Sequence, residues 1–202
     1  MHNKLFFFDL ETTGLDYNQH AIHQISGKII IDGQEKESFN IRVKPFDGAI
    51  IDPQALAACH VTEEMIVQEG IDQVQAHDQL VAILRKYVSP YDKKDKFFMA
   101  GYNIAGFDKD FFRKFFERCG DKYFGSWFWP VTVDVMVLAQ ALMMDIRTTM
   151  ENFKQGTVAK TLGITVDEAE LHDALYDIHI CFEIYKKLME RMQPFTPEPT
   201  LF

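Results

Sequence analysis

Residues 6–15 read Phe-Phe-Phe-Asp-Leu-Glu-Thr-Thr-Gly-Leu. The aromatic run predicts a buried strand, and because strand side chains alternate between two faces, Asp9 and Glu11 point to one side and Leu10 to the other. Two neighbouring buried carboxylates repel each other and lose hydration unless a cation compensates them. Oxygen-only ligands suit Mg²⁺ or Mn²⁺ better than Zn²⁺. The stretch predicts a divalent-metal site, with two acids at a solvated rim as the alternative.

Length and composition predict one globular domain with a substantial core, since the chain has 202 residues, 47% of them hydrophobic. A formal net charge of -9 argues against a broad basic surface for long nucleic acids and leaves room for a short contact. The three cysteines have no zinc-site spacing, so we expect a reduced cytoplasmic protein without sulfur-bound metal. The sequence also shows no pattern of a cleaved leader or of a membrane span, so we expect neither.

The order of apolar segments predicts an α/β sheet. Residues 22–31 are rich in isoleucine, Asp32-Gly33 is a hairpin signal, and residues 38–43 alternate, so the first three strands should be antiparallel. Helical spacing over 72–87 is followed by a short apolar strand at 97–101. Strand, helix and strand in this order are expected of an α/β fold.

Two further acids lie where such folds place their sites. Asp108 begins the helix after the strand at 97–101, and Asp177 lies in the first turn of the last helix. His172 precedes that helix and could act as a general base if it lies on the loop ahead of it. Each has a simpler explanation, because the helix dipole stabilises acids at helix starts and histidines are often surface residues.

Aromatic residues are the other candidates for contact with a ligand. Phe107 lies close enough to Asp108 to suggest base stacking, whereas the phenylalanines of the following helix form a core stripe. Trp127 and Trp129 lie in an aromatic loop over 125–130, and we interpret them as core anchors in preference to stacking platforms.

Three motifs, taken together and in order, resemble the DnaQ-like, DEDDh-type 3′–5′ exonucleases, which include the proofreading epsilon subunit of DNA polymerase III. Asp9 to Gly14 match D-x-E-T-T-G without a mismatch. The motif N-x-x-x-F-D is met by Asn103, Phe107 and Asp108, and H-x-x-x-x-D by His172 and Asp177. Three ordered matches are specific, unlike any one alone. The resemblance implies a ribonuclease-H-like α/β fold with a central mixed five-stranded sheet flanked by helices.

The resemblance also implies roles for individual residues. Four carboxylates would hold two divalent ions, Mg²⁺ or Mn²⁺, and His172 would deprotonate the water that attacks the phosphodiester. The acids are Asp9, Glu11, Asp108 and Asp177. Residues implied to bind substrate are Thr12, Thr13, Gly14, Leu15, His60, Asn103 and Phe107. At His60 the family's usual H-G-I reads His-Val-Thr here.

The substrate expected from the T-T-G form of the first motif is single-stranded DNA or a frayed 3′ end. Alternatives are RNA trimming of the ribonuclease T or oligoribonuclease kind, a non-catalytic nucleic-acid-binding domain, and a metal-dependent phosphatase or endonuclease. We expect the exonuclease domain to span 1–192 and an extended or disordered tail to span 193–202. The tail's Leu201-Phe202 resembles the end of a sliding-clamp-binding peptide, so a clamp or polymerase is a possible partner, and no membrane is expected.

Overall fold

The computed structural model describes residues 3–167 and 173–192. Five strands form one sheet in the order β3-β2-β1-β4-β5. The strands are β1 (Lys4–Thr12), β2 (Ile22–Ile31), β3 (Gln34–Arg42), β4 (Phe97–Gly101) and β5 (Phe128–Asp134). The expectations for His172 and for the tail at 193–202 lie outside the described residues.

The sheet is mixed, as expected. β1 pairs antiparallel with β2, and β2 pairs antiparallel with β3, whereas β1–β4 and β4–β5 are parallel. The β2–β3 hairpin turns at Asp32 and Gly33, whose φ angles of 51° and 79° suit the twist of the flanking strands. The predicted α/β class and the antiparallel first three strands are therefore confirmed.

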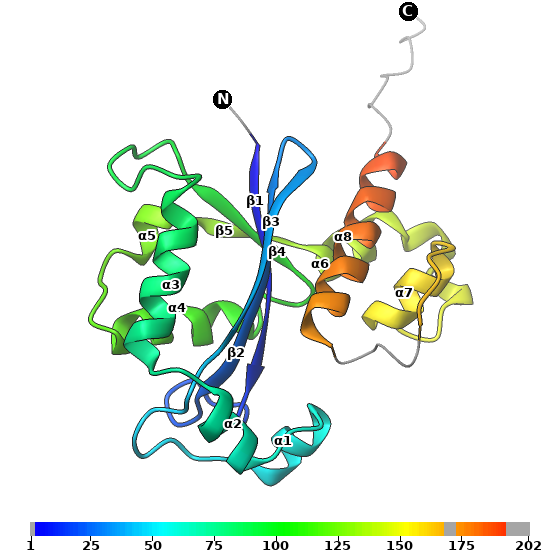
Figure 1. Ribbon diagram of the computed structural model, residues 1–202. Coiled ribbons are helices and arrows are strands. Elements are labelled where there is room, and N and C mark those ends of the chain that lie inside the picture. Colours follow the sequence, from blue (N-terminus) through cyan, green and yellow to red (C-terminus); the bar gives the residue numbers. More distant parts are fainter. Residues whose placement is uncertain (1–2, 168–172, 193–202) are drawn as a thin grey trace, which may run out of the picture.

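Helices cover both faces of the sheet (Figure 1). One layer contains α3 (Gln73–Arg85), α4 (Asp108–Arg118) and α5 (Phe124–Trp127), and the other contains α6 (Val135–Leu142), α7 (Gln155–Thr161) and α8 (Ala174–Arg191). The 3-10 helix η1 (Met144–Thr149) connects α6 to α7. Two short helices, α1 (Pro53–Ala58) and α2 (Glu63–Glu69), lie beyond the end of β1. The end of β1 is thus enclosed by helices from three directions.

Strand β1 is the centre of both cores. Phe6, Phe8 and Leu10 belong to the apolar cluster shared with α3 and α4, while Leu5 and Phe7 belong to the cluster shared with α6 and α8. The alternation predicted from the sequence is confirmed, since Leu10 lies in the first cluster and Asp9 follows the alternation to the other face.

The segment 124–134 differs from the expectation of an aromatic loop over 125–130. It forms the helical turn α5, and β5 already starts at Phe128. Pro130 is tolerated inside β5 because this strand is at the edge of the sheet, where one side needs no ladder hydrogen bond. Trp127 is 3% exposed and belongs to the core, as predicted, whereas Trp129 is half-buried and stacks on Phe98.

The segment 145–156 follows α6 in the second helical layer. It contains most of η1 and the start of α7. Gly163 follows α7 with a φ of 73°, the left-handed conformation predicted for a residue just past a helix end. Within the described ranges, no helix is both long and apolar enough to cross a lipid bilayer.

Candidate active site

Four acids predicted from separate motifs come together at the end of β1. Asp9 and Glu11 extend from β1, Asp108 is the first residue of α4, and Asp177 lies in the first turn of α8. Burial raises the pKa of Asp9 well above its ordinary value, and the charges of Asp108, Glu11 and Asp177 raise it further. Because all three act on one half-buried carboxyl, the four acids form a single cluster.

Asp108 is the most buried of these acids, with 6% of its surface exposed. Burial raises its pKa to about 7, and the charges of Glu11 and Asp134 add to the rise. The N–H of Leu10 donates a hydrogen bond of 3.3 Å to Oδ1 of Asp108, which lowers the pKa and ties α4 to β1. The fold therefore holds a carboxyl that is costly to ionise without a nearby cation.

Aromatic packing places α8 against β1. The ring of Phe7 lies 5.2 Å from that of Phe182 and 5.6 Å from that of Tyr185, centroid to centroid. The side chain of Gln155 on α7 donates to the main-chain oxygen of Asp177 at 2.9 Å. These contacts join three elements that are distant in sequence and bring Asp177 to Asp9.

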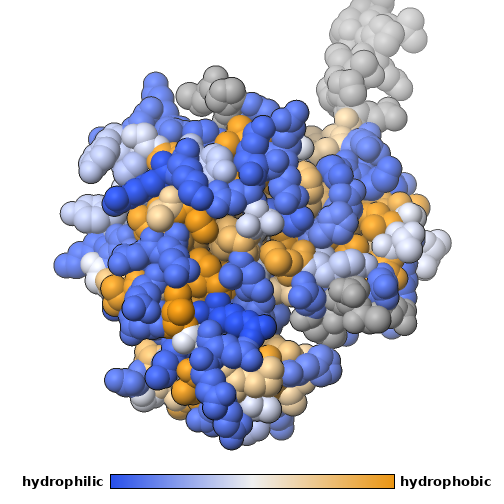
Figure 2. Space-filling model, in the orientation of Figure 1, coloured by the Kyte–Doolittle hydropathy of each residue, from blue (hydrophilic) through white to orange (hydrophobic). Residues whose placement is uncertain are grey.

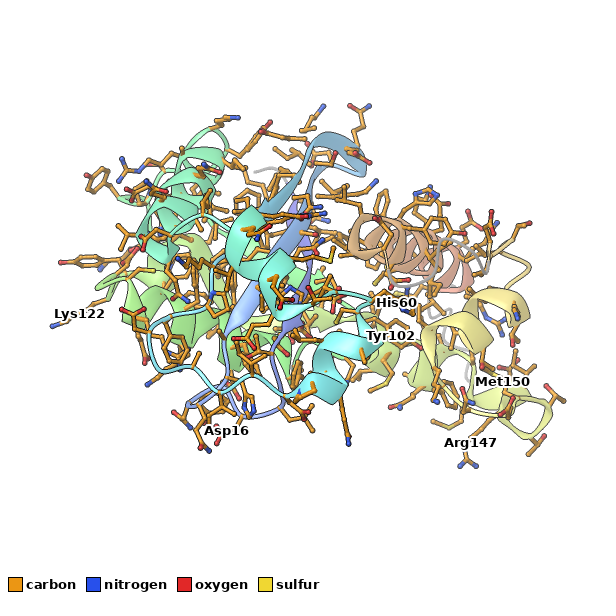
Figure 3. All side chains as sticks on the ribbon, turned by 60° about the horizontal axis from the view of Figure 1, so that its bottom comes forward. Asp16, His60, Tyr102, Lys122, Arg147 and Met150 are labelled. Atoms are coloured by element: carbon orange, nitrogen blue, oxygen red, sulfur yellow. The ribbon has the colours of Figure 1, made fainter. Side chains whose placement is uncertain are left out.

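A cavity of about 630 Å³ opens beside the acids. Asp9, Asp177 and Tyr102 line its inner side, and η1 and α7 with the segment between them line the other, including Lys154 and Lys160. Both lysines are exposed, so their charges face solvent near two carboxylates. In Figure 3, Tyr102 lies near the centre of the molecule and Met150 lies toward the η1–α7 side. The two lysines were missed by sequence analysis, because isolated lysines have no distinguishing pattern.

Asp134 is another residue beside the site that the sequence motifs do not include. Its carboxylate caps α6, accepting from the N–H of Met136 at 3.0 Å. The same carboxylate accepts from the N–H groups of Asn103 at 3.1 Å and Ala105 at 3.0 Å. Asp134, which is 6% exposed, thus fixes the conformation of the loop that precedes Asp108.

Two of the predicted substrate-binding residues in the turn after β1, Thr13 and Gly14, are buried and have structural contacts. Thr13 is fully buried, donates to the carbonyl of Ile50 at 2.7 Å and accepts from the N–H of Ala21 at 2.9 Å. Gly14 is closely covered by the His20 ring, which a Cβ at this position would meet at 2.0 Å. Both residues hold the turn in place.

The remaining turn residues are differently placed. Thr12 is buried and its hydroxyl donates to the carbonyl of Gly14 at 2.8 Å. Leu15 is 81% exposed, which is unusual for a large apolar side chain beside a cluster of buried acids. Of the four turn residues, Leu15 is the one whose side chain projects into solvent.

The loop between β4 and α4 contains the other predicted pair. Asn103 is exposed and has a φ of 62°, a left-handed conformation that asparagine tolerates better than most residues. Its carbonyl accepts from the N–H of Gly106 at 3.3 Å, so it forms the turn before Asp108. Phe107 is half-buried, with its ring centroid 4.8 Å from that of Phe111.

His60 follows a residue that contacts one of the acids. His60 is exposed with a φ of 55°, and Figure 3 shows it near Tyr102 in that view. The Sγ of Cys59 donates to Oε2 of Glu11 at 2.9 Å. Because a left-handed φ is what the glycine of H-G-I would supply, the motif fits better with Cys59 at its histidine position. Sequence analysis missed this one-residue offset.

The donor set at the acid cluster fits hard divalent ions. Four carboxylates, whose burial and mutual charge oppose ionisation at Asp9 and Asp108, offer only oxygen ligands. A bound cation would reverse this penalty, since it favours the charged form of each carboxylate. The residues present therefore suit Mg²⁺ or Mn²⁺.

Comparison with known proteins decides the family. A sequence model of the exonuclease (RNase T) family matches residues 6–185, which include all four acids. The chain belongs to the exonuclease family. The resemblance to DEDDh-type 3′–5′ exonucleases of the ribonuclease-H-like superfamily is confirmed, and with it the prediction of a nuclease that hydrolyses phosphodiesters. The exonucleases of this family depend on divalent metal ions.

Relatives of this exonuclease include bacterial proteins named ribonuclease T. The protein of Pectobacterium atrosepticum is 27% identical over 192 residues, which cover 91% of this chain and 80% of the relative. The protein of Shewanella frigidimarina is 27% identical over 193 residues, with the same coverage of both chains.

Solved structures confirm the fold of the exonuclease. E. coli exonuclease I in complex with a dT13 oligonucleotide superposes with a TM-score of 0.74 at 18% identity over 94% of this chain. A complex described as ExoI/SSB-Ct superposes with a TM-score of 0.73 at 17% identity over 95% of this chain. The chain spans only 41% and 42% of those two solved chains.

Proposed function

We propose that this exonuclease removes nucleotides one at a time from single-stranded 3′ ends and releases nucleoside 5′-monophosphates. The observation that supports this most is the gathering of Asp9, Glu11, Asp108 and Asp177 beside an open cavity. A buried carboxylate cluster without a cation is costly, so its presence in a solvent-accessible cleft favours a metal-assisted reaction.

In this proposal the four acids hold two divalent ions, Mg²⁺ or Mn²⁺. When bound, such ions supply activation of water and stabilisation of the leaving oxygen of a phosphodiester. Asp9 and Glu11 would be positioned by the pairing of β1, and Asp108 by its hydrogen bond from Leu10. His172 would accept the proton of the attacking water, as its place in the H-x-x-x-x-D motif suggests.

Other residues would bind the 3′ end. Leu15 is exposed beside the acids and would pack on the terminal base, with Phe107 stacking on the same or the next base. Thr12 and Asn103 would support the site, and His60 would lie near the substrate. On the opposite side of the cavity, the charges of Lys154 and Lys160 would attract backbone phosphates.

Two polymers are candidates for the substrate. The T-T-G form of the first motif favours single-stranded DNA, and this is the first candidate. RNA is the second candidate, because the relatives named ribonuclease T match 91% of this chain at 27% identity. A net charge of -9 would weaken the grip on either polymer, so a tethering partner such as a polymerase or sliding clamp would raise activity.

The test is a time course on 5′-labelled single-stranded DNA and RNA of one sequence, with Mg²⁺, with Mn²⁺ and with EDTA. We expect a metal-dependent ladder of products shortened one nucleotide at a time. Asp9→Asn should abolish the ladder. Asp78→Asn is the matched control, since Asp78 is exposed on α3, and it should retain wild-type rates.

The products distinguish this proposal from the alternatives. Internal cuts would indicate an endonuclease, free phosphate a phosphatase, and tight binding without cleavage a non-catalytic nucleic-acid-binding domain. Each of these outcomes would overturn the proposal. A ladder formed only on RNA would replace the first candidate by the second. His172→Ala should retain metal binding, measured by calorimetry, while losing most of the cleavage rate.

A further inference from the structure

A second group of potential metal ligands adjoins the acid cluster. Glu11, His23 and Cys59 each offer one ligand atom, and these atoms lie within 4.8 Å of one another. The three residues come from β1, from β2 and from the end of α1. Cys59 already donates to Glu11 at 2.9 Å. Unlike the acid cluster, this group combines oxygen, nitrogen and sulfur.

His23 owes its position to a β-bulge. The pairing of β1 with β2 shifts register between Glu11 and Thr12, since Glu11 pairs with Gln24 and Thr12 with Ile22. His23 is therefore the additional residue on β2. Bulges re-aim side chains and are frequent beside active sites. Here the bulge lies directly opposite Glu11.

The imidazole of His23 is buried without a partner for one of its nitrogens. The residue is 3% exposed, and its Nε2 makes no hydrogen bond to any residue that the structure describes. Buried ring nitrogens are nearly always hydrogen-bonded or metal-bound, so an orphaned one needs an explanation. A ligand between His23, Cys59 and Glu11 would provide one.

The spacing of the three ligand atoms suits a tetrahedral ion after a small adjustment. Zinc bonds of ~2.0–2.3 Å to oxygen, nitrogen and sulfur place neighbouring ligand atoms roughly 3.3–3.8 Å apart. The Sγ–Oε2 pair would open slightly from 2.9 Å, and because no pair is more than 4.8 Å apart, the other pairs would close by at most about 1.5 Å. Glu11 and Cys59 are only half-buried, so an ion can enter and water can complete the coordination.

We propose that Glu11, His23 and Cys59 bind one thiophilic divalent ion, with Zn²⁺ as the natural candidate. On binding, the Cys59 thiol releases its proton to solvent and coordinates as thiolate, neutral His23 coordinates through a ring nitrogen, and Glu11 coordinates through an oxygen. Hard Mg²⁺ is a poor ligand partner for sulfur, so this site and the acid cluster select different ions. The expectation that no metal binds through sulfur would then be wrong.

Occupancy of this site has a consequence for catalysis that rests on the proposed function. Zn²⁺ would hold the Glu11 carboxylate toward Cys59 and His23 and would add a second positive charge beside the acid cluster, so its binding there opposes the binding of Mg²⁺ at the cluster. The exonuclease would then be inhibited by Zn²⁺ in the presence of excess Mg²⁺. Cys59 and His23 would determine the sensitivity without taking part in the reaction.

The binding test uses Co²⁺ as a spectroscopic probe of the full-length protein in reducing buffer. Coordination by Cys59 gives a thiolate-to-cobalt charge-transfer absorption in the near ultraviolet, which an all-carboxylate site cannot give. We expect this band in the wild type at one equivalent of Co²⁺, and its displacement by Zn²⁺ and persistence in excess Mg²⁺. Cys59→Ser should remove the band, and Cys119→Ser, the matched control, should retain it.

His23→Gln provides a second variant and should weaken Co²⁺ binding at least about tenfold, since even loss of a residue supporting a metal ligand costs ten- to a hundredfold. Circular dichroism would verify that each variant is folded. The absence of a cobalt–thiolate band in the folded wild type would overturn the proposal. A water in the cavity of about 30 Å³ that His23 borders would then be the partner of Nε2.

The inhibition test is separate. In a Mg²⁺-activated nuclease assay, the concentration of Zn²⁺ that halves the rate should rise at least about tenfold in Cys59→Ser. Equal Zn²⁺ sensitivity of both proteins would overturn the inhibitory role. The cobalt band does not depend on nuclease activity. A protein that shows the band but cleaves no nucleic acid would therefore contradict the proposed exonuclease function and not the proposed metal site.

Discussion

Asp134 shows how one buried carboxylate supports a site it does not enter. It accepts hydrogen bonds from the N–H groups of Asn103 and Ala105 and caps α6. We expect Asp134→Ala to lower the free energy of unfolding by about 1–3 kcal/mol, because the N–H groups of Asn103, Ala105 and Met136 lose their acceptor. It should also lower kcat more than it raises KM, because Asp108 would be misplaced. Urea unfolding and steady-state kinetics measure the two effects. Unchanged kcat in a folded variant would contradict the positioning role.

The raised pKa of Asp108 should make the stability of the protein depend on pH. Burial raises its pKa from 3.8 to about 7, so the metal-free folded state binds a proton that the unfolded state has released. The contribution of this residue to stability is therefore greatest below about pH 4 and is lost as the pH rises to about 7. Asp108→Asn should raise the free energy of unfolding of the EDTA-treated protein at about pH 8 by an amount on the order of 2–4 kcal/mol, measured by urea denaturation, while abolishing cleavage.

The control for this prediction is how the stability difference between Asp108→Asn and the wild type changes with pH. The stabilisation by Asp108→Asn should shrink between about pH 8 and about pH 5, where the wild-type carboxyl is protonated and costs little. A difference that is independent of pH would contradict the assignment of the raised pKa to Asp108.

At the scale of elements, α7 and the residue just before it supply positive charge opposite the acids. Lys154 and Lys160 line the cavity together with Asp9 and Asp177. We expect each lysine-to-alanine change to raise KM by up to about fivefold, which corresponds to about 1 kcal/mol for an exposed ion pair. The dependence of log KM on log salt should fall by roughly 0.7 for each phosphate contact removed from a single strand.

The matched control for these changes is Lys122→Ala. Lys122 is exposed and lies at the opposite end of the molecule from Arg147 in Figure 3. Its loss removes the same net charge without removing charge from the cavity. An equal change in KM for Lys122→Ala and Lys154→Ala would mean that net charge, not the α7 lysines, sets affinity.

Strand β1 is the element on which both cores depend. The fully buried ring of Phe6 lies within 6.0 Å, centroid to centroid, of five other phenylalanine rings. We expect Phe6→Ala to lower the free energy of unfolding by about 3–5 kcal/mol, measured by urea denaturation, because it leaves a cavity beneath the strand that carries the acids. Tyr91→Ala, at a 94% exposed position, should change stability by less than about 0.5 kcal/mol.

At the scale of the whole molecule, the acid cluster couples metal binding to folding. If divalent ions bind the folded cluster, as proposed, and not the dispersed acids of the unfolded chain, Mg²⁺ should stabilise the protein by about 2.7 kcal/mol at a hundred times its Kd. The effect should be larger at about pH 8 than at about pH 5.5, because bound carboxylates must be deprotonated. Thermal unfolding with Mg²⁺ and with EDTA measures it. Asp177→Asn should reduce the stabilisation, and an unchanged effect would place the bound ion elsewhere.

The surface of the whole molecule is consistent with a site at one end of the sheet. Figure 2 shows the α1–α2 lobe standing off from the main body, with hydrophilic and hydrophobic residues intermixed on this face. Met65 and Val67 of α2 are 37% and 39% exposed. The acids lie where this lobe, the end of β1 and α8 converge, which is an arrangement that no single segment specifies.

The sequence alone predicts the first four strands, the hairpin at Asp32-Gly33 and the four acids that the fold brings together, because alternation, turn chemistry and motif spacing are local properties of the chain. It also determined the family, since three motifs occur in order.

The neighbours that complete the site follow from the tertiary structure. Asp134 reaches Asn103 across 31 residues, and Cys59 reaches Glu11 across 48. His23 is brought to Glu11 by a bulge, and the α7 lysines by the packing of α7 against α8. These contacts depend on strand register and helix packing, which arise from the burial of many apolar side chains at once and leave no short pattern in the sequence.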